Sequence, residues 1–478
     1  MTDVDVAIAG AGPSGLALAI LLAQRGVSVR VLEERAQPGT HSRAIGLHPP
    51  GLEVLDLAGV GAAAVEAGVR ITSGVALHGP GPDGAVGSGT VRPGTVRPGT
   101  VRPGTVGPGV SAVASMDFGV LPGPHRYVLA LPQTATQALL EERLALLDPG
   151  ALRRGIRVEA FHPGPDGVCV RTSAGGAGPF REGGTPHGET PHGETPHGRP
   201  PVSPVLTAGS LTARFLVGAD GVRSGTRDAL GLPFRGVAHP DRYVMADYPD
   251  TTGFGPTAAL FLHPEGIVES FPLPGGQRRW VARLPGGRAT PPPPRNGTGD
   301  GSAPWEAAEG PAPDRLHEAL AATIARRTGH SVEEAGAVPT VFGTARRRVP
   351  RMADGPVVLI GDAAHEVSPI GGQGMTLGLL DAAQLAGILC AALATTRGTG
   401  RGAGRGAVPD AAARAALERF SARRLRAARA AGRAAHLNMV LGRPLPGALL
   451  RGRDRAIGAL VGRGAVHDAV ARHFTMQG

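Results

Sequence analysis

The opening segment of the chain restricts its fold more than any other stretch. An apolar run over residues 5–9 predicts a buried parallel strand, and three glycines follow it in the spacing G-x-G-x-x-G. Residues 14–25 have helical periodicity, and residues 27–32 form a second apolar run. This order of strand, glycines, helix and strand is that of a dinucleotide-binding unit. It predicts an α/β fold with a Rossmann-like sheet.

Each residue of this motif has a physical role. Gly10 permits the tight turn, Gly12 lets a pyrophosphate approach the backbone, and Gly15 allows the helix to pack closely on the strand. Pro13 and Ser14 open the helix, whose free N–H groups and dipole favour an anion. We therefore expect these five residues to bind the pyrophosphate of a dinucleotide.

A carboxylate at the end of the second strand indicates which dinucleotide binds. Glu33 directly follows the last apolar residue of that strand, and Glu34 is the competing candidate. A carboxylate there accepts hydrogen bonds from ribose hydroxyls, and it would repel a 2′-phosphate. FAD or NAD therefore fits this site better than NADP.

Two further segments lie far along the chain. In FLVGADGVRSGTRDALG, a predicted strand leads into Asp220 and Gly221. In VVLIGDAAHEVSPIGGQGMTLGLLDAA, another predicted strand leads into Gly361 and Asp362. The carboxylate of Asp362 can bind a hydroxyl of a sugar alcohol. Both segments therefore place candidate cofactor ligands at the ends of strands.

A loop with little side-chain bulk follows the third segment. It contains Pro369 and Gly372, and we expect a helix to start near Gly374 or Met375. The free N–H groups of that helix could face a flat, electron-rich ring and stabilise negative charge on it.

Taken together, the three segments resemble the FAD-dependent aromatic hydroxylases with the para-hydroxybenzoate hydroxylase fold, especially the bacterial aromatic-polyketide and phenol hydroxylases. The resemblance covers roughly residues 1–395. It implies an α/β fold in which a discontinuous Rossmann-like FAD-binding domain is interleaved with a mixed β-sheet substrate domain, followed by a helical C-terminal tail.

The resemblance also assigns positions to the cofactor. Arg43 matches an arginine that approaches the pyrophosphate, and Gln133 matches a glutamine near the flavin. Thr376 departs from the family, which often has Asn there, so a polar contact to the flavin could be altered. The expected FAD-binding residues are Gly10, Gly12, Pro13, Ser14, Gly15, Glu33, Arg43, Gln133, Asp220, Gly221, Gly361, Asp362, Pro369, Gly372, Gly374 and Met375.

The domains are expected to alternate along the chain. Strand-like runs between the motifs, at 74–78, 126–131, 243–247, 258–262, 266–272 and 280–284, fit a mixed sheet over the reactive edge of the flavin. The expected order is a first FAD-binding portion at 1–73, a first substrate-sheet portion with a Pro/Gly repeat loop at 74–132, a second FAD-binding portion with a repeat loop at 133–232, a second substrate-domain portion at 233–340, a third FAD-binding portion at 341–395, and a linker with C-terminal helices at 396–478.

The resemblance implies a monooxygenase. NAD(P)H would be a transient co-substrate that reduces FAD, and O2 would give a flavin C4a-hydroperoxide that transfers one oxygen atom to an aromatic or polyketide-like small molecule. A Baeyer–Villiger or epoxidising monooxygenase, an FAD-dependent reductase, a redox-inert FAD module and an NAD dehydrogenase remain alternatives. No catalytic base is identified; His78, Tyr127 and Tyr243 are better explained as structural residues.

Composition excludes several other classes. All 49 basic residues are Arg, and the absence of lysine argues against the flavin-dependent halogenases, which rely on an active-site lysine. Aromatic residues make up only 3%, so the formal charge of +10 does not indicate a nucleic-acid-binding protein. The two cysteines, Cys169 and Cys390, have no metal-site spacing, and no metal is expected.

The sequence also bears on the location and assembly of the protein. We find no apolar run of transmembrane length and no basic leader before the first strand, so we expect a cytoplasmic protein without a membrane partner. A monomer or homodimer is expected. Two five-residue repeats, at 89–109 and 183–198, are interpreted as expanded surface loops.

Overall fold

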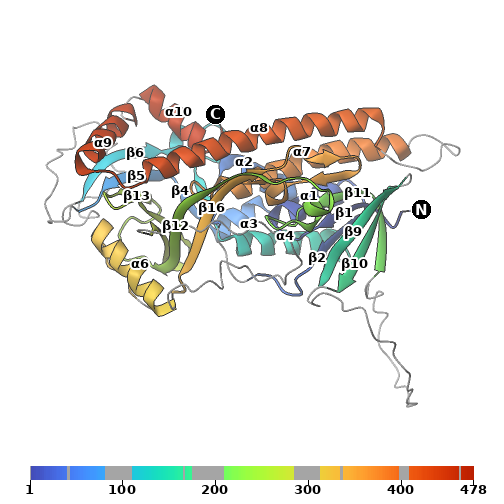
Figure 1. Cartoon of the computed structure of the whole chain (residues 1–478), viewed down its shortest axis with the longest axis horizontal. Helices are drawn as coiled ribbons and strands as arrows, with labels where there is room; N and C mark the ends of the chain where they lie inside the picture. Colours follow the sequence, from blue (N-terminus) through green and yellow to red (C-terminus); the bar gives the residue numbers. More distant parts are fainter. Residues whose placement is uncertain are drawn as a thin grey trace, which may run out of the picture.

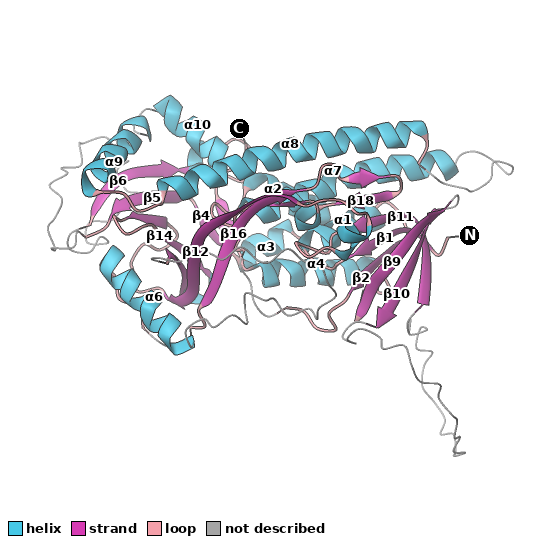
Figure 2. Cartoon of the chain, in the orientation of Figure 1, coloured by secondary structure: helices cyan, strands magenta, loops and turns pink. Residues whose placement is uncertain are grey.

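The computed structural model describes residues 2–39, 44–80, 110–164, 167–174, 209–284, 313–333, 337–397, 409–461 and 464–477. Figure 1 shows a sheet at each end of an elongated molecule, with the long helix α8 (Ala411–Leu441) running along one side. Helices also lie between the sheets (Figure 2). Both repeats and Arg43 lie outside the described residues.

The first sheet is the predicted dinucleotide-binding sheet. Its strands follow the order β17-β18-β11-β1-β2-β8, and β10 and β9 extend it from β11. The strands β18, β11, β1, β2 and β8 are all parallel to their neighbours within this run. The strands are β1 (Val4–Ala9), β2 (Val29–Glu33), β8 (Leu152–Arg154), β9 (Ile156–Gly164), β10 (Gly167–Ala174), β11 (Gly209–Gly218), β17 (Ala353–Asp354) and β18 (Val357–Leu359).

Helices pack on this sheet because its strands are apolar on both faces. Helix α1 (Pro13–Ala23) is buried along almost its whole length, which explains why its sequence has no polar face. It packs between α4 (Gln133–Leu147) and α7 (Gln373–Arg397), and α8 covers α7. The other helices are α2 (Pro49–Ala58), α3 (Gly61–Ala67), α5 (Gly225–Ala229), α6 (Pro313–Thr328), α9 (Gly447–Val461) and α10 (Gly464–Phe474).

The second sheet is mixed, as expected. Its order is β19-β16-β12-β15-β14-β13-β5-β6, with β5 and β13 parallel and the other pairs antiparallel. One face packs on α6 through Leu320 and Ile324. The strands are β5 (Ser73–His78), β6 (Ser111–Asp117), β12 (Arg235–Pro249), β13 (Ala258–Leu262), β14 (Val268–Leu273), β15 (Gln277–Arg283), β16 (Thr340–Arg348) and β19 (His365–Glu366).

Two details differ from the sequence analysis. The run at 126–131 does not join the second sheet, because β7 (Val128–Ala130) pairs instead with β3 (Gly46–Leu47) and β4 (Val69–Ile71). Strand β16 pairs with β12 in the second sheet, although most of it falls in the stretch assigned to the cofactor domain. The predicted fold, with its interleaved domains and C-terminal helices, is confirmed.

Helix α7 is more apolar than the sequence analysis allowed. By length and composition, its segment Gln373–Ala394 could cross a membrane. Its side chains Leu377, Leu385 and Leu389 are fully buried in the molecule, where α7 packs on α1 and α8. Internal packing therefore accounts for the apolar composition of this helix.

A buried carboxylate in α7 ties the third segment to α8. Asp381 accepts hydrogen bonds from the Gly361 N–H at 2.9 Å and from the His365 ring at 2.7 Å. The Arg424 guanidinium of α8 also donates to Asp381 and reaches the Leu377 carbonyl. Asp381 has no exposed surface. The charges of this cluster therefore compensate one another away from water.

Replacing Asp381 should be strongly destabilising. Asp381→Ala leaves Arg424 and His365 buried without their anion, and we expect the free energy of unfolding to fall by about 3–5 kcal/mol. Asp354→Ala is the matched control, because Asp354 forms an exposed pair with Arg351 that should contribute less than about 1 kcal/mol. Equal losses in urea unfolding would contradict this account.

The same cluster predicts a pH effect on stability. Burial alone would lower the pKa of His365, but the attraction and hydrogen bond of Asp381 outweigh it and raise this pKa above its ordinary value of 6.5. The stabilisation is therefore complete below pH 6.5 and is lost as pH rises through the raised pKa. In urea unfolding, the stability advantage of wild type over His365→Asn should shrink above pH 6.5; a constant difference would contradict this prediction.

Candidate cofactor site

The first two segments meet at the carboxyl ends of β1 and β11. Gly10 has φ of +98°, and a Cβ there would lie 2.5 Å from the Ala219 carbonyl oxygen. A Cβ on Gly15 would lie 2.3 Å from the Gly10 carbonyl oxygen. Glycine is therefore required at both positions so that α1 and the loop after β11 can approach the first turn.

The third segment reaches the same place from the other side of α1. A Cβ on Gly361 would lie 2.9 Å from the Ser14 hydroxyl oxygen, and one on Gly378 would lie 2.2 Å from it. Ser14 is thus enclosed by the turn after β18 and by α7. This packing brings together three segments that are separated by about 200 and 140 residues.

Gly12 and the start of α1 suit a pyrophosphate. Gly12 is the N-cap of α1 and has no side-chain hydrogen bond, and Pro13 occupies the first turn. A Cβ on Gly12 would meet no protein atom within 4 Å, in contrast to Gly10 and Gly15. Backbone N–H groups and the positive end of the helix dipole therefore face open space beside Gly12, which a side chain at this position would fill.

Glu33 lies beside the glycine turn, whereas Glu34 points elsewhere. The Ala11 N–H donates to the Glu33 carboxylate at 2.8 Å, and the Arg35 N–H donates to its other oxygen at 3.1 Å. Each oxygen keeps a lone pair that can accept from a ribose hydroxyl. Glu34 forms an exposed ion pair with Arg157 at 3.2 Å, so the geometry favours Glu33 as the ribose ligand.

The Asp220 carboxylate holds its own turn. One oxygen accepts from the Thr226 N–H and hydroxyl, each at 2.9 Å, and the other accepts from the Ser224 hydroxyl. Gly221 has φ of +78°, and its Cβ position is open. Asp220 therefore shapes the loop that contacts Gly10, and a cofactor would meet mainly the backbone of this segment.

Asp362 follows β18 and faces solvent. Its side chain is exposed, yet the surrounding protein removes enough hydration to raise the pKa of Asp362 to about 6. Hydroxyl groups of a sugar alcohol would donate hydrogen bonds to this carboxylate in place of the displaced water. Such a partner would favour the charged carboxylate and lower its pKa.

The ring-side loop, residues 369–372, owes its shape to glycine. Gly371 and Gly372 have φ of +96° and +66°, and the Gly372 N–H donates to the Pro369 carbonyl at 2.9 Å. Helix α7 then begins at Gln373, one or two residues before the predicted start, so Gly374 and Met375 lie in its first turn. The free N–H groups of that turn adjoin the loop, as expected.

His48 braces this loop and was not singled out from the sequence. Its Nε2 donates to the Gly371 carbonyl at 2.9 Å, and burial lowers the pKa of His48 to about 4, so the ring is neutral. Its backbone N–H donates to the Thr376 hydroxyl at 3.2 Å. A Cβ on Gly51 would lie 2.9 Å from that hydroxyl, so glycine at position 51 lets α2 approach Thr376 closely.

Gln133 lies in the described part of the structure, but Arg43 does not. Gln133 starts α4, and its backbone N–H donates to the Ala44 carbonyl at 3.0 Å. This bond joins α4 to the chain directly after Arg43, which lies outside the described residues. The likeness to the family remains the basis for both assignments.

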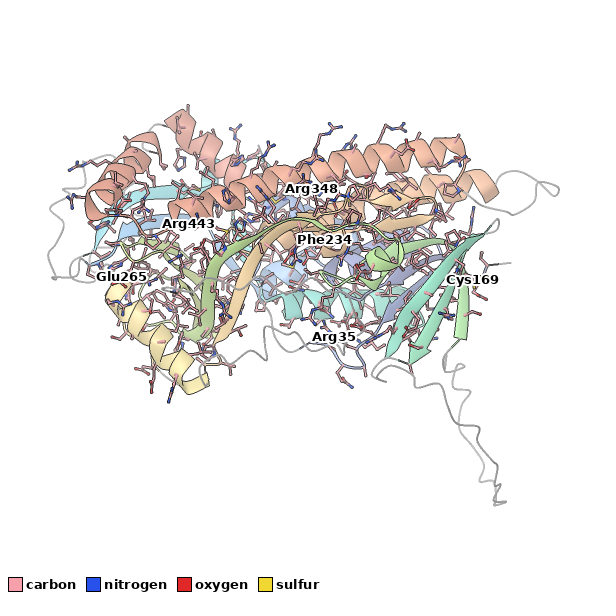
Figure 3. The ribbon with its side chains drawn as sticks, in the orientation of Figure 1. Arg35, Cys169, Phe234, Glu265, Arg348 and Arg443 are labelled. Atoms are coloured by element: carbon pink, nitrogen blue, oxygen red, sulfur yellow. The ribbon has the colours of Figure 1, made fainter. Side chains whose placement is uncertain are left out.

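Arg227 is a second residue whose role in the site was not expected from the sequence. It is buried, and it donates to the Val222 carbonyl at 2.9 Å and to the Ala363 carbonyl at 3.5 Å. Its guanidinium lies 4.2 Å from the centre of the Phe234 ring, a residue labelled in Figure 3. Arg227 therefore links the second and third segments. Its position in a polar, Arg-rich stretch gave no signal of this role.

A surface cavity of about 580 Å³ lies elsewhere, between α8 and the turn that contains β17. Arg351, Arg414, Ser421 and Arg429 are among its lining residues, and none of the assigned cofactor residues lines it. The cavity is therefore separate from the convergence of the three segments.

Fold and site together define a dinucleotide-binding flavoprotein architecture. The open Gly12 position, the uncapped start of α1 and the exposed Asp362 fit FAD, since they match its pyrophosphate and sugar-alcohol moieties. The family model described as "FAD binding domain" matches residues 3–181 and 202–403. The chain therefore belongs to the FAD-binding domain family.

Named relatives share most of this chain. The 12-dehydrotetracycline 5-monooxygenase/anhydrotetracycline 6-monooxygenase of Streptomyces rimosus is 29% identical over 399 residues, which is 82% of this chain and 63% of that protein. The pentachlorophenol 4-monooxygenase of Sphingobium chlorophenolicum is 23% identical over 386 residues, covering 80% and 57%. The chain thus spans less than two thirds of the length of these curated relatives.

Solved structures show the same fold. The p-nitrophenol 4-monooxygenase of Pseudomonas putida DLL-E4 superposes with a TM-score of 0.72 at 21% identity, covering 100% of this chain and 99% of that one. CabE, an aromatic hydroxylase from angucycline biosynthesis, gives 0.63 at 26% identity, covering 99% and 76%.

Two glycine substitutions should separate folding from cofactor binding. Gly12→Ala occupies open space at an ordinary φ of −74°, so we expect the stability of the FAD-free protein to change by less than about 0.5 kcal/mol. Its methyl group would obstruct the pyrophosphate, and FAD affinity should fall at least about tenfold, measured by flavin fluorescence.

Gly10→Ala is the matched comparison. Its Cβ would clash with Ala219 at a strained φ, so the FAD-free protein itself should lose about 2 kcal/mol or more. Unchanged FAD affinity in Gly12→Ala would contradict the assignment of this turn to the pyrophosphate.

Proposed function

We propose that this chain is an FAD-dependent monooxygenase that uses NAD(P)H and O2 to insert one oxygen atom into an aromatic or polyketide-like small molecule. One observation carries the proposal: the ring-side loop adjoins the three cofactor segments through α7 and packs, through Ile370, on an apolar face of the second sheet. The monooxygenase names of the relatives support it.

The chain's own residues would bind and orient the cofactor. When bound, FAD supplies the hydride acceptance and the oxygen activation that amino-acid side chains lack. Gly12 and the start of α1 would hold its pyrophosphate, Glu33 its ribose, and Asp362 its ribityl chain. The N–H groups at the start of α7 would stabilise negative charge on the edge of the ring.

The second sheet would hold the substrate over the ring. Met245, Val281 and Leu262 form an apolar surface beside Ile370. Such a surface excludes water and binds the face of an aromatic molecule. NAD(P)H would bind only transiently, since the sequence contains one dinucleotide motif of this kind.

Isotope labelling tests this function directly. The purified protein, loaded with FAD, would be incubated with NADH or NADPH, ¹⁸O-labelled O2 and a panel of polycyclic phenols. We expect a product that has gained one labelled oxygen atom, detected by mass spectrometry, with Gly12→Ala less active at limiting FAD. Consumption of NAD(P)H without a labelled product from any member of the panel would contradict oxygen insertion.

A further inference from the structure

The middle of the second sheet carries one carboxylate in an otherwise apolar row. Directly opposite positions on five adjacent strands are Met245, Val281, Glu269, Leu260 and Ala76. Opposite residues of paired strands share a face of the sheet. Glu269 therefore projects from the same face as four apolar side chains.

This face lies against the ring-side loop. Met245 and Val281 belong to a buried cluster with Ile370 of that loop and with Met439 of α8, and Leu260 packs against the same cluster. Ile370 lies between two residues of the loop assigned to the flavin ring, Pro369 and Gly371. Glu269 is therefore on the side of the sheet where the proposed substrate would meet the ring.

Glu269 is buried and has no polar partner among the described residues. Its exposed fraction is 8%, and neither a hydrogen bond nor an ion pair to its carboxylate occurs in the described part of the chain. A carboxylate with so little exposure and no polar partner is costly, and its oxygens are not among the fully enclosed polar atoms of the described residues, so a ligand can reach them. Such a group is therefore more easily explained by a ligand than by the fold.

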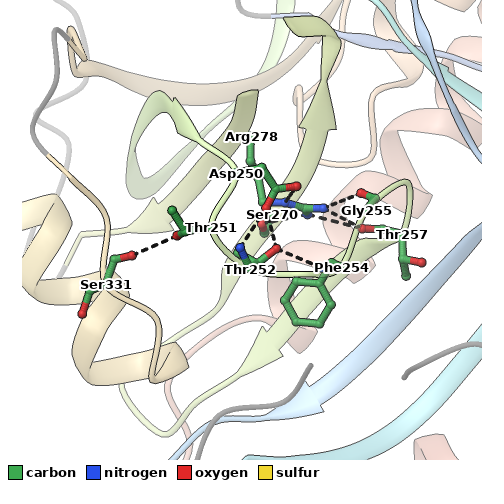
Figure 4. A network of polar contacts seen from close by, with 9 residues as sticks. All are labelled: Asp250, Thr251, Thr252, Phe254, Gly255, Thr257, Ser270, Arg278 and Ser331. Atoms are coloured by element: carbon green, nitrogen blue, oxygen red, sulfur yellow. Dashed lines mark hydrogen bonds and ion pairs between the residues drawn. The ribbon is translucent and has the colours of Figure 1, made fainter. Parts of the chain in front are cut away.

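The opposite face shows how this chain satisfies a buried charge. Arg278 is fully buried on β15, and its guanidinium pairs with Asp250 at 3.1 Å. It also donates to the Gly255 carbonyl at 2.7 Å and to the Ser270 hydroxyl at 3.1 Å (Figure 4). Ser270 is the residue directly after Glu269, so one strand contributes to a polar network on one face and carries an unpartnered carboxylate on the other.

Three cations on the face of Glu269 already have anions. Arg279 binds both oxygens of Asp247, at 2.7 and 2.8 Å. Arg283 donates to Asp241 at 2.8 Å, and Arg443 binds the same carboxylate at 2.9 Å; Figure 3 labels Arg443. Each arginine is thus engaged by another carboxylate, and Glu269 remains unneutralised.

We propose that Glu269 is the base that removes the hydroxyl proton of a phenolic substrate, which rests on the function proposed above. The phenolic O–H bond breaks, the proton bonds to a carboxylate oxygen of Glu269, and the electron pair stays on the phenolic oxygen. Its delocalisation makes the ring a better nucleophile for oxygen transfer. The proton passes to water before the next turnover.

The acidity of Glu269 suits this role. Burial raises the pKa of Glu269 to about 7, and a base with a pKa near the working pH combines availability with proton affinity. Burial, and after it the nearby charge of Glu269, raises the pKa of Tyr243 above its ordinary value, so the Tyr243 hydroxyl stays neutral. The other charged or titratable groups toward this face fall into two sets. Most have a partner: Arg279 with Asp247, Arg283 and Arg443 with Asp241, His78 with Asp454 of α9, and His436 of α8 stacked on His239. Arg346 and Arg348 of β16 lie against α8, Arg346 at Gly432 and Arg348 near Arg429 and Arg433.

Binding of a phenol tests the assignment without turnover. FAD-loaded wild type should bind a phenol as the phenolate, seen as a new ultraviolet absorption band that grows as pH rises through about 7. Glu269→Gln should bind the same phenol without this band, whereas Glu269→Asp should retain some of it. Glu318→Gln is the control, because Glu318 is exposed on α6, across the sheet; it should behave as wild type.

Turnover gives the second readout. For a phenol that is un-ionised at the assay pH, kcat/KM of Glu269→Gln should fall by about 10²–10⁴-fold and lose its rise with pH. A nitrophenol that is already ionised should be turned over at close to the wild-type rate. A merely structural glutamate would affect both substrates equally.

The outcomes separate the two proposals. A phenolate band and a wild-type rate in Glu269→Gln would overturn the role of Glu269. If wild type ionises bound phenols through Glu269 but incorporates no labelled oxygen, the monooxygenase function fails and the proton-accepting role stands.

Discussion

The buried carboxylate of Asp381 is the interaction on which the arrangement of the site depends. It receives the N–H of Gly361, the ring of His365 and the guanidinium of Arg424, so a single side chain fixes the turn after β18 relative to α7 and α8. That turn contains Asp362, and α7 begins directly after the ring-side loop. Loss of the Asp381 carboxylate would therefore free the turn after β18 to move relative to α7, and both contribute to the proposed FAD site.

Close backbone contact completes the convergence. Gly10 meets the carbonyl of Ala219, and Ser14 is enclosed by Gly361 and Gly378 at distances that a Cβ would not permit. Gly12 differs, because its surroundings are open. Within one motif, Gly10 and Gly15 therefore serve close packing, whereas Gly12 leaves space for a cofactor. The difference is that a methyl group would clash at the first two positions and would meet no protein atom at Gly12.

The second sheet keeps its two faces chemically distinct. Arg278 is held by a network of polar partners on the α6 side, whereas Glu269 projects among apolar residues beside the ring-side loop. Strand alternation places Glu269 and its neighbour Ser270 on opposite faces. A substrate lying against the loop would thus meet the Glu269 carboxylate in an apolar setting, which raises the basicity of that carboxylate.

The sequence by itself determined the dinucleotide unit, the three segments and the α/β class, because strand, glycine and helix patterns act over a few residues and local sterics enforce them. It also favoured Glu33 over Glu34, which the contact with Ala11 agrees with. Only the tertiary structure decided the roles of Asp381, Arg227, His48 and Glu269. Each depends on partners, or on the lack of them, from strands and helices distant in the sequence, and no local pattern records which charges are neutralised when those elements pack.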